Sequence, residues 1–125
     1  MAASDPSENH RLFEQAWNRQ DVDALLDLYE EDAVYVASAD ERLTGHVAIR
    51  AMLEQMAALK IPNRLELLAL TENGDTALER TRWTMQFPGE GGAVIEQSGY
   101  STVVLRRQSD GNWRMVIDDP GLAGS

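Results

Sequence analysis

Asp118 is the residue of this chain best placed for acid–base chemistry, because it ends an apolar stretch. It closes "WRMVID" (residues 113–118) and is followed by a second acid, Asp119. A carboxyl group in apolar surroundings has a raised pKa and can exchange protons near neutral pH. The alternative role is structural, with Asp118 or Asp119 accepting backbone hydrogen bonds or pairing with an arginine at the end of the sheet. The sequence leaves both roles open.

Aromatic residues with polar atoms gather in "WNRQDVDALLDLYEEDAVYV" (residues 17–36). The hydroxyls of Tyr29 and Tyr35 could donate hydrogen bonds to an oxygen of a ligand, and the indole N–H of Trp17 is a further candidate donor. The same residues also suit an ordinary core in which each polar atom finds a partner nearby. We expect Trp17, Tyr29 and Tyr35 to converge on one interior wall.

Metal and phosphate chemistry have little support in the sequence. His10 and His46 are isolated and expected to face solvent, so no histidine pair has the spacing of a metal site. "PGEGG" (residues 88–92) lacks the lysine and the following helix of a phosphate-binding loop. The acidic run "EED" (residues 30–32) is expected to be a solvated helix end. We therefore predict no metal and no cofactor.

Composition narrows the class of protein. The 125 residues suit one domain, and the formal net charge of −10 disfavours nucleic acid and anionic membranes as partners. The chain has no cysteine, which excludes disulfides and thiol catalysis. The polar, acidic N-terminus does not resemble a secretory signal, and no apolar run is long enough to cross a bilayer. We expect a cytoplasmic location.

Three helices are expected to position these residues. "DPSE" (residues 5–8) is a variant of the capping box and predicts a helix that starts at Asp5. Asp21 can cap a second helix, and Thr44-Gly45 opens a third, which Pro62 ends. Each has an apolar face at helical spacing: Leu12, Phe13, Ala16 and Trp17 in the first, Val22, Leu25, Leu26 and Tyr29 in the second, and Ile49, Met52, Leu53 and Met56 in the third.

Strand patterns fill the remaining sequence, first over residues 34–36 and then over 64–70, 76–87, 93–107 and 113–118. Asn73-Gly74 predicts a type I′ hairpin turn with positive φ at both residues, and Gly99 is a candidate bend in a long strand. The order α-α-β-α-β-β-β-β predicts an α+β fold, with helices gathered on one face of a curved, mainly antiparallel sheet. The last residues, "GLAGS", are expected to be a frayed tail.

Three segments link the chain to a known family: "FEQAWNRQDVDALLDLYEEDAVYV", "LTGHVAIRAML" and "YSTVVLRRQSDGNWRMVIDD". Together they resemble the nuclear-transport-factor-2-like (NTF2-like) superfamily, and within it the SnoaL-like, ketosteroid-isomerase-like group of mostly uncharacterised bacterial proteins. The resemblance covers roughly residues 9–120 of a single domain spanning 1–125. It implies a cone-shaped, cystatin-like fold in which the curved sheet wraps around helices and encloses an apolar cavity. It also implies a homodimer formed through the sheet face.

The superfamily includes ketosteroid isomerases, polyketide cyclases, epoxide hydrolases, dehydratases and non-catalytic binding proteins, so the fold does not decide the activity. The isomerase mechanism needs a carboxylate base, a tyrosine and a carboxylic acid kept neutral by an apolar site. Along the isomerase pattern these positions fall on Ala37, Phe13 and Val103, which lack the required groups. The resemblance therefore excludes steroid isomerisation by that mechanism.

The resemblance also implies which residues line the cavity. Because residues two apart in a strand share a face, Val116 and Asp118 are expected to point into it, while Met115 and Ile117 point away. In polyketide cyclases of the family an aspartate on a late strand does acid–base work, and Asp118 is similar in position. The expected ligand-binding wall consists of Phe13, Trp17, Tyr29, Tyr35, Met52, Leu53, Met56, Ser101, Val103 and Val116.

Two functions fit these expectations. The first is a cofactor-free enzyme of the isomerase, cyclase or dehydratase type that acts on a small apolar molecule, with Asp118 as its acid–base group. The second is a non-catalytic module for ligand binding or dimerisation. An Asp–Arg–Asp group like that of the family's epoxide hydrolases would need Arg80 or Arg82 beside Asp118, and a solvated strand face is the alternative. A nuclear transport role has no support beyond the fold.

Overall fold

Six strands form a single sheet in the order β2-β1-β6-β5-β4-β3. The computed structural model describes residues 2–121, so most of the expected C-terminal tail, residues 122–125, lies outside the described residues. All neighbouring strands pair antiparallel except β1 and β6, which are parallel. The mixed, mainly antiparallel sheet is the one that the sequence predicted. The strands are β1 (Tyr29–Val36), β2 (Arg42–Thr44), β3 (Asn63–Asn73), β4 (Thr76–Pro88), β5 (Val94–Arg107) and β6 (Trp113–Asp119).

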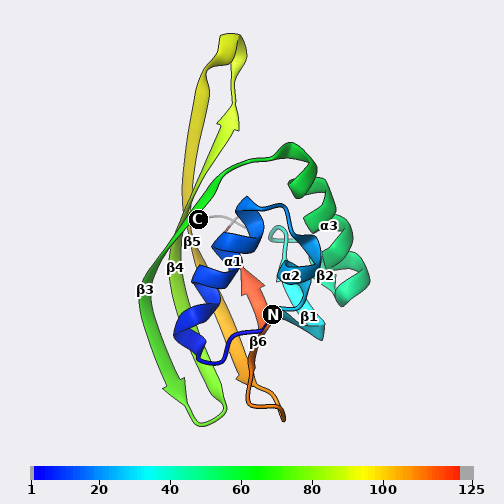
Figure 1. Ribbon diagram of the computed structural model, residues 1–125, viewed down its shortest axis with the longest axis vertical. Coiled ribbons are helices and arrows are strands. Elements are labelled where there is room, and N and C mark those ends of the chain that lie inside the picture. Colours follow the sequence, from blue (N-terminus) through cyan, green and yellow to red (C-terminus); the bar gives the residue numbers. More distant parts are fainter. Residues whose placement is uncertain (1, 122–125) are drawn as a thin grey trace.

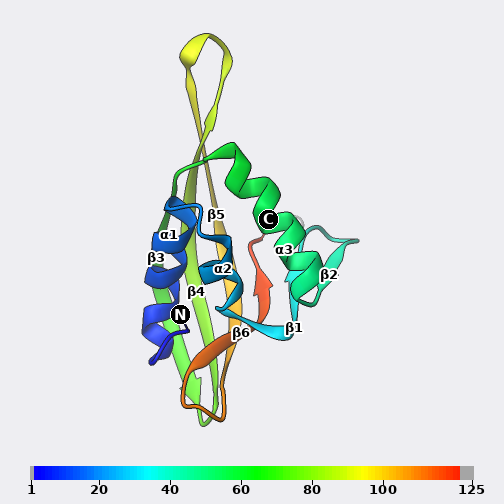
Figure 2. The ribbon, with the colours of Figure 1, turned by 45° about the vertical axis from the view of Figure 1, so that its right-hand side comes forward.

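The helices gather on one side of the curved sheet, with α1 along β3 and α3 beside β1 and β2 (Figures 1 and 2). Asp5 accepts a hydrogen bond from the Ser7 amide and starts a 3-10 turn that leads into α1. Asp21 caps α2 through the Ala24 amide, as predicted. The helical segments are η1 (Pro6–Glu8), α1 (Asn9–Asn18), α2 (Val22–Leu26), α3 (His46–Leu59) and η2 (Glu90–Gly92).

The second helix is shorter than its sequence pattern predicted, and the first strand is longer. The helix ends at Leu26, and Tyr29 already belongs to β1, where it pairs with Met115 of β6. The Met115 amide donates to the Leu28 carbonyl at 2.7 Å, so pairing with β6 replaces the last helical turn. The "EED" run is therefore part of β1, and Glu30 forms an ion pair with Arg106 at 2.7 Å. The short strand β2 was not expected.

Turns and close contacts fix the long strands. Asn73 pairs with Thr76, so the central residues of the β3–β4 turn are Gly74 and Asp75, one position later than predicted. Gly74 has φ +62°, whereas Asp75 is not among the described residues with positive φ, so the type I′ prediction is wrong. Gly99 lies opposite Trp83, and a Cβ atom there would lie 2.4 Å from the indole ring. Gly99 is thus needed for close packing.

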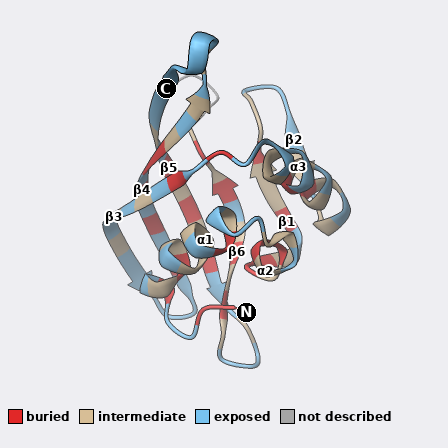
Figure 3. Ribbon diagram, turned by 45° about the horizontal axis from the view of Figure 1, so that its top comes forward, coloured by how far each residue is buried: buried red, intermediate tan, exposed pale blue. Residues whose placement is uncertain are grey.

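Buried and exposed residues alternate along β4 (Figure 3), so the two faces of the sheet differ in burial. The inner face meets the helices and carries the core around Tyr29, Ile49, Leu53 and Leu105. The outer face is exposed, and the far end of the β4–β5 hairpin projects beyond the rest of the molecule (Figure 1). Within residues 2–121, no helix is long and apolar enough to cross a lipid bilayer.

Candidate functional site

A cavity lies between the helices and the inner face of the sheet, with walls from α1, α3 and five strands. The volume open to the centres of water molecules is about 50 Å³. About 10–15 Å³ on this measure holds one water, so the cavity has room for roughly three to five. The lining residues are Asn9, His10, Phe13, Trp17, Tyr29, Tyr35, Met52, Leu53, Asn63, Leu65, Glu79, Thr81, Trp83, Met85, Ser101, Val103, Met115, Asp118 and Pro120.

Asp118 points into this cavity from β6 and is 6% exposed. A β-bulge sets its direction. Val104 pairs with Ile117 and the next residue of β5, Leu105, pairs with Met115, so Val116 is the extra residue on β6. A bulge shifts the alternation by one position. Met115 and Asp118 consequently both face the cavity, and the expectation that Val116 lines it is wrong because strict alternation does not hold there.

The Tyr29 hydroxyl donates a hydrogen bond to Asp118 Oδ2 at 2.6 Å. This length is typical of an O–H donor and a charged oxygen. Burial raises the pKa of Asp118 to about 6, against the lowering effect of the Tyr29 hydrogen bond. Burial and the neighbouring Asp118 charge raise the pKa of Tyr29 well above its usual value. At neutral pH the pair is therefore a carboxylate held by a neutral phenol.

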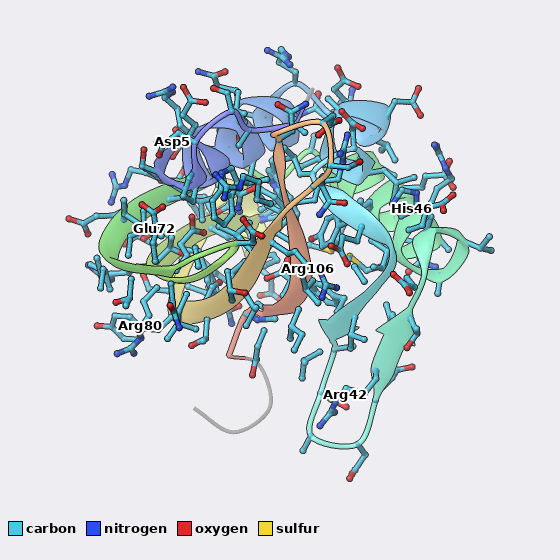
Figure 4. The ribbon with its side chains drawn as sticks, turned by 90° about the horizontal axis from the view of Figure 1, so that it is seen from below. Asp5, Arg42, His46, Glu72, Arg80 and Arg106 are labelled. Carbon is cyan, nitrogen blue, oxygen red and sulfur yellow. The ribbon has the colours of Figure 1, made fainter. Side chains whose placement is uncertain are left out.

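Asp118 has no arginine partner within the described part of the chain. Arg80 and Arg82 are exposed on the outer face of β4, and Arg80 lies at the edge of the molecule, directed away from the helices (Figure 4). An Asp–Arg–Asp arrangement of the epoxide hydrolase kind is therefore ruled out. Arg80 and Arg82 instead belong to a solvent-exposed face of β4.

The structure brings eight of the ten expected wall residues to the cavity: Phe13, Trp17, Tyr29, Tyr35, Met52, Leu53, Ser101 and Val103. Met56 lies elsewhere, since one turn beyond Met52 it lines a separate small hollow with Leu25 and Lys60. Phe13 and Val103 present only carbon where the isomerase pattern has a tyrosine and an acid. Ala37 follows the end of β1 and is not among the described lining residues.

Two indole N–H groups are already occupied at the cavity wall. Trp17 donates to the Ile61 carbonyl and Trp83 to the Pro120 carbonyl, both at 2.8 Å. The prediction that the Trp17 N–H is available to a ligand is therefore wrong. Phe13 stacks on Trp17 with ring centroids 5.8 Å apart and meets Tyr29 edge-on. These contacts make one side of the cavity a fixed aromatic wall.

The sequence interpretation missed a group of polar residues in the cavity lining. Glu79 is 1% exposed on the inner face of β4, and burial raises its pKa to about 7. Asn9 donates to Glu79 Oε1 at 3.5 Å, and Asn63 and His10 lie in the same lining. The alternation Ala77, Glu79, Thr81, Trp83 was the available signal, because it places an acid among residues that face the core.

The two histidines differ from expectation. His10 is half-buried and lines the cavity, and burial lowers the pKa of its imidazole. His46 is also half-buried, with Nε2 2.9 Å from the Tyr29 carbonyl oxygen. The expectation that both face solvent is therefore wrong. Among residues 2–121, no three His, Cys, Asp or Glu side chains are grouped so that they could hold a metal ion.

Solved structures with the same fold agree with this architecture. An NTF2-like protein with a cystatin-like fold from Novosphingobium aromaticivorans is 25% identical, with a TM-score of 0.79 over 97% of this chain and 84% of the other. A ketosteroid isomerase-like protein from Erwinia carotovora atroseptica is 16% identical, with a TM-score of 0.78 over 90% and 89%. A proposed NTF2-like dehydratase from Streptomyces avermitilis is 18% identical, with a TM-score of 0.78 over 95% and 94%.

Sequence comparison supplies the family. No curated protein matches the chain significantly. The SnoaL-like domain family matches residues 10–115, which is most of the sequence and includes α1 through the first part of β6. The cone of helices and curved sheet around an apolar cavity is the architecture that the resemblance implied. The chain therefore belongs to the SnoaL-like domain family.

Proposed function

We propose that this protein binds a small, uncharged, mainly apolar molecule in its cavity and moves a proton within that molecule. The observation that carries the proposal is the Asp118 carboxyl, which is buried in the cavity wall with the Tyr29 hydroxyl as its side-chain partner. A carboxylate with this burial and no basic partner in the described chain is unfavourable as a structural element. A buried carboxyl with a shifted pKa beside a cavity of ligand size is typical of functional sites.

The size and lining of the cavity support a ligand with about one ring. Room for three to five waters corresponds to roughly 90–150 Å³ at about 30 Å³ per water, and an apolar cavity of about 150 Å³ holds benzene. The lining contains no lysine or arginine among the described residues, so an anionic ligand would have no counter-charge there. A neutral molecule avoids the free-energy cost of burying a charge without a partner.

The chemistry follows from the pKa of Asp118. A pKa of about 6 leaves the carboxylate ionised at pH 7, yet basic enough to accept a proton from carbon or oxygen. The protonated carboxyl can then return the proton at a second position, which amounts to an isomerisation, or assist the loss of water. Tyr29 holds the carboxylate in place through its hydrogen bond. These steps use only side chains of this chain.

Hydrogen exchange in a simple ketone tests the proposal. Cyclohexanone in D₂O loses its α-hydrogens when a base removes them, and NMR follows the loss. We expect the wild-type protein to accelerate this exchange and Asp118→Asn to reduce the acceleration by about 10²–10⁴-fold, the usual contribution of a general base. Asp40→Asn, in the exposed β1–β2 loop, is the matched control and should leave it unchanged.

The outcome separates the two functions. Binding of cyclohexanone without accelerated exchange in any variant would favour a non-catalytic ligand-binding module over an enzyme. Acceleration that survives Asp118→Asn would remove Asp118 from the mechanism. Mass spectrometry of small molecules that co-purify with the protein would then name the natural ligand.

We also propose that two copies associate through the outer face of the sheet. Leu78, Val104 and Ile117 are lateral neighbours across β4, β5 and β6, and they form an apolar row on that face. Leu78 and Ile117 are 43% and 40% exposed, and Tyr100, four residues before Val104 on β5, is 52% exposed. A row of large, partly exposed apolar side chains is more stable when a second copy covers it.

A further inference from the structure

Three buried polar atoms have no hydrogen-bond partner within residues 2–121, and all three belong to residues that line the cavity. They are Asn9 Oδ1, Asn63 Oδ1 and Glu79 Oε2. Asn9, Asn63 and Glu79 are each at least nine-tenths buried. Buried polar groups are nearly always paired, so several unpaired ones around one space point to a partner that enters that space.

Glu79 and Asp118 share one row of the sheet. Glu79 pairs with Val103 across β4 and β5, and Val103 pairs with Asp118 across β5 and β6. Two strand spacings of about 4.8 Å separate their backbones by roughly 10 Å. All three side chains face the cavity, and only the small Val103 lies between the two carboxyl groups. A ligand in the cavity can therefore meet both acids at once.

Asn9 and Glu79 together offer one donor and one acceptor when Glu79 is neutral. The Asn9 amide donates to Oε1, which leaves the proton of Oε2 as a donor and Asn9 Oδ1 as an acceptor. If the amide faces the other way, Asn9 accepts from Glu79, and the free atoms are again one donor and one acceptor. A hydroxyl group satisfies both, because it donates and accepts. A carbonyl oxygen satisfies only the donor.

We propose that Asn9 and Glu79 form a second polar site in the cavity, which binds a hydroxyl group of the ligand. The ligand class is then a small neutral alcohol whose hydroxyl lies about one ring away from the atom that meets Asp118. This inference rests on the proposed function, since it needs the cavity to hold a ligand. Burial holds Glu79 largely neutral below pH 7, and the nearby Asp118 charge acts in the same direction.

Cyclohexanol and cyclohexanone test the site, because they share a ring and differ in hydrogen-bond donation. Their binding to ¹⁵N-labelled protein is measured by NMR titration at pH 6 and pH 8.5. At pH 6 we expect cyclohexanol to bind at least about fivefold more tightly, the effect of one additional hydrogen bond. At pH 8.5 Glu79 is ionised and cannot donate a hydrogen bond. The affinity for cyclohexanone should therefore fall at least about tenfold, and the affinity for cyclohexanol should fall by less.

Variants assign the effect to the two residues. Glu79→Leu and Asn9→Leu should each remove the preference for the alcohol. Glu79→Gln keeps a donor and an acceptor at every pH, so it should retain binding of both probes and lose the pH dependence for cyclohexanone. Glu72→Gln, at an exposed position of β3, is the matched control. The amide spectrum of each variant shows whether it is folded. If a Leu variant does not fold, the loss of pH dependence in Glu79→Gln decides the test.

Asp118 must be separated from Glu79 in these titrations, because both titrate in the same cavity. The pH series is therefore repeated in Asp118→Asn, where Glu79 is the remaining carboxyl of the lining, and the loss of cyclohexanone binding should persist. Equal binding of the two probes, unchanged by Glu79→Leu, overturns the inference and leaves the proposed function standing. If neither probe binds the wild-type protein, the proposed function fails together with the inference.

Discussion

The hydroxyl of Tyr29 lies 2.6 Å from the carboxyl of Asp118, although 89 positions separate them in the sequence. The parallel pairing of β1 with β6 brings them together, because Tyr29 begins β1 beside Met115 and Asp118 lies three residues farther along β6. Both side chains are buried. The buried carboxyl of the cavity is thus held by a side chain from the first strand of the sheet as well as by its own strand.

Removing the Tyr29 hydroxyl should raise the pKa of Asp118. The hydrogen bond stabilises the ionised carboxyl and so lowers its pKa. In Tyr29→Phe this effect is lost, and burial raises the pKa of Asp118 above its present value of about 6. ¹³C NMR of carboxyl-labelled aspartate follows the titration directly. Tyr100→Phe, at an exposed position, should have no effect. An unchanged or lower Asp118 pKa in Tyr29→Phe would contradict the structural assignment of this pair.

The protein should lose stability as the pH rises from about 4 to 7, the range between the unfolded and the folded pKa values of its two buried acids. Asp118 and Glu79 have folded-state pKa values of about 6 and about 7, both above their usual 3.8 and 4.5. A raised pKa means that the neutral form stabilises the fold below the unfolded pKa, and this stabilisation is lost as each group ionises. Each difference corresponds to roughly 3 kcal/mol of unfolding free energy.

Urea unfolding at several pH values measures this loss. Asp118→Asn and Glu79→Gln should each flatten the pH dependence and make the variant relatively more stable than wild type at pH 8. Glu30, whose pKa is lowered by Arg106, acts in the opposite direction only below about pH 4.5. His10, whose pKa is lowered by burial, opposes the loss below about pH 6.5, so the series is also measured in His10→Gln. Stability that rises steadily from pH 4.5 to 7 in wild type would refute the assignment of two buried acids with raised pKa values.

Gly99→Ala should destabilise the fold by about 1–3 kcal/mol, the usual cost of forcing a methyl group into a filled space. The new Cβ would lie 2.4 Å from Trp83 Cζ2, and Trp83 cannot easily move because its N–H is bonded to the Pro120 carbonyl. Thermal unfolding measures the change. Gln97→Ala, two residues away on the exposed part of β5, should change stability by less than about 0.5 kcal/mol.

Charge on the outer face should prevent association of two copies. Leu78→Asp introduces a carboxylate into the apolar row, and two copies facing each other would bring like charges together. Light scattering after gel filtration should give a dimer for wild type and a monomer for the variant, with the same amide spectrum for the inner face. Val47→Asp, at the exposed start of α3, should remain dimeric. A monomeric wild type would contradict the association.

Element types and the fold class were predictable because they follow local patterns. Helical spacing placed Phe13, Trp17, Met52 and Leu53 on the correct faces, and the capping residues Asp5 and Asp21 act as expected. Helical spacing also predicted that Tyr29 belongs to the second helix, but Tyr29 begins β1. Pairing with β6 decides the conformation of that residue, and a pattern within one segment contains no information about its partner strand.

The candidate site was predictable in part. Asp118 was found because it stands out in an apolar stretch, but the argument for its direction was wrong, since the bulge at Val116 changes the alternation and is invisible in the sequence. Glu79 was overlooked beside the more conspicuous Arg80. A carboxylate in a strand of charged residues is expected to be solvated, but Glu79 follows the alternation of Ala77, Thr81 and Trp83 and lies in one row with Val103 and Asp118.

The placement of the tryptophans has a practical consequence. Two of the three, Trp17 and Trp83, line the cavity, and the third, Trp113, is buried with Arg107 above its ring at 5.7 Å. Both cavity indoles are held by hydrogen bonds to backbone carbonyls, so their orientation is fixed. Any molecule that enters displaces solvent from these rings and changes their ultraviolet emission. The protein thus carries an intrinsic fluorescent reporter of occupancy, suited to label-free screening of large compound collections.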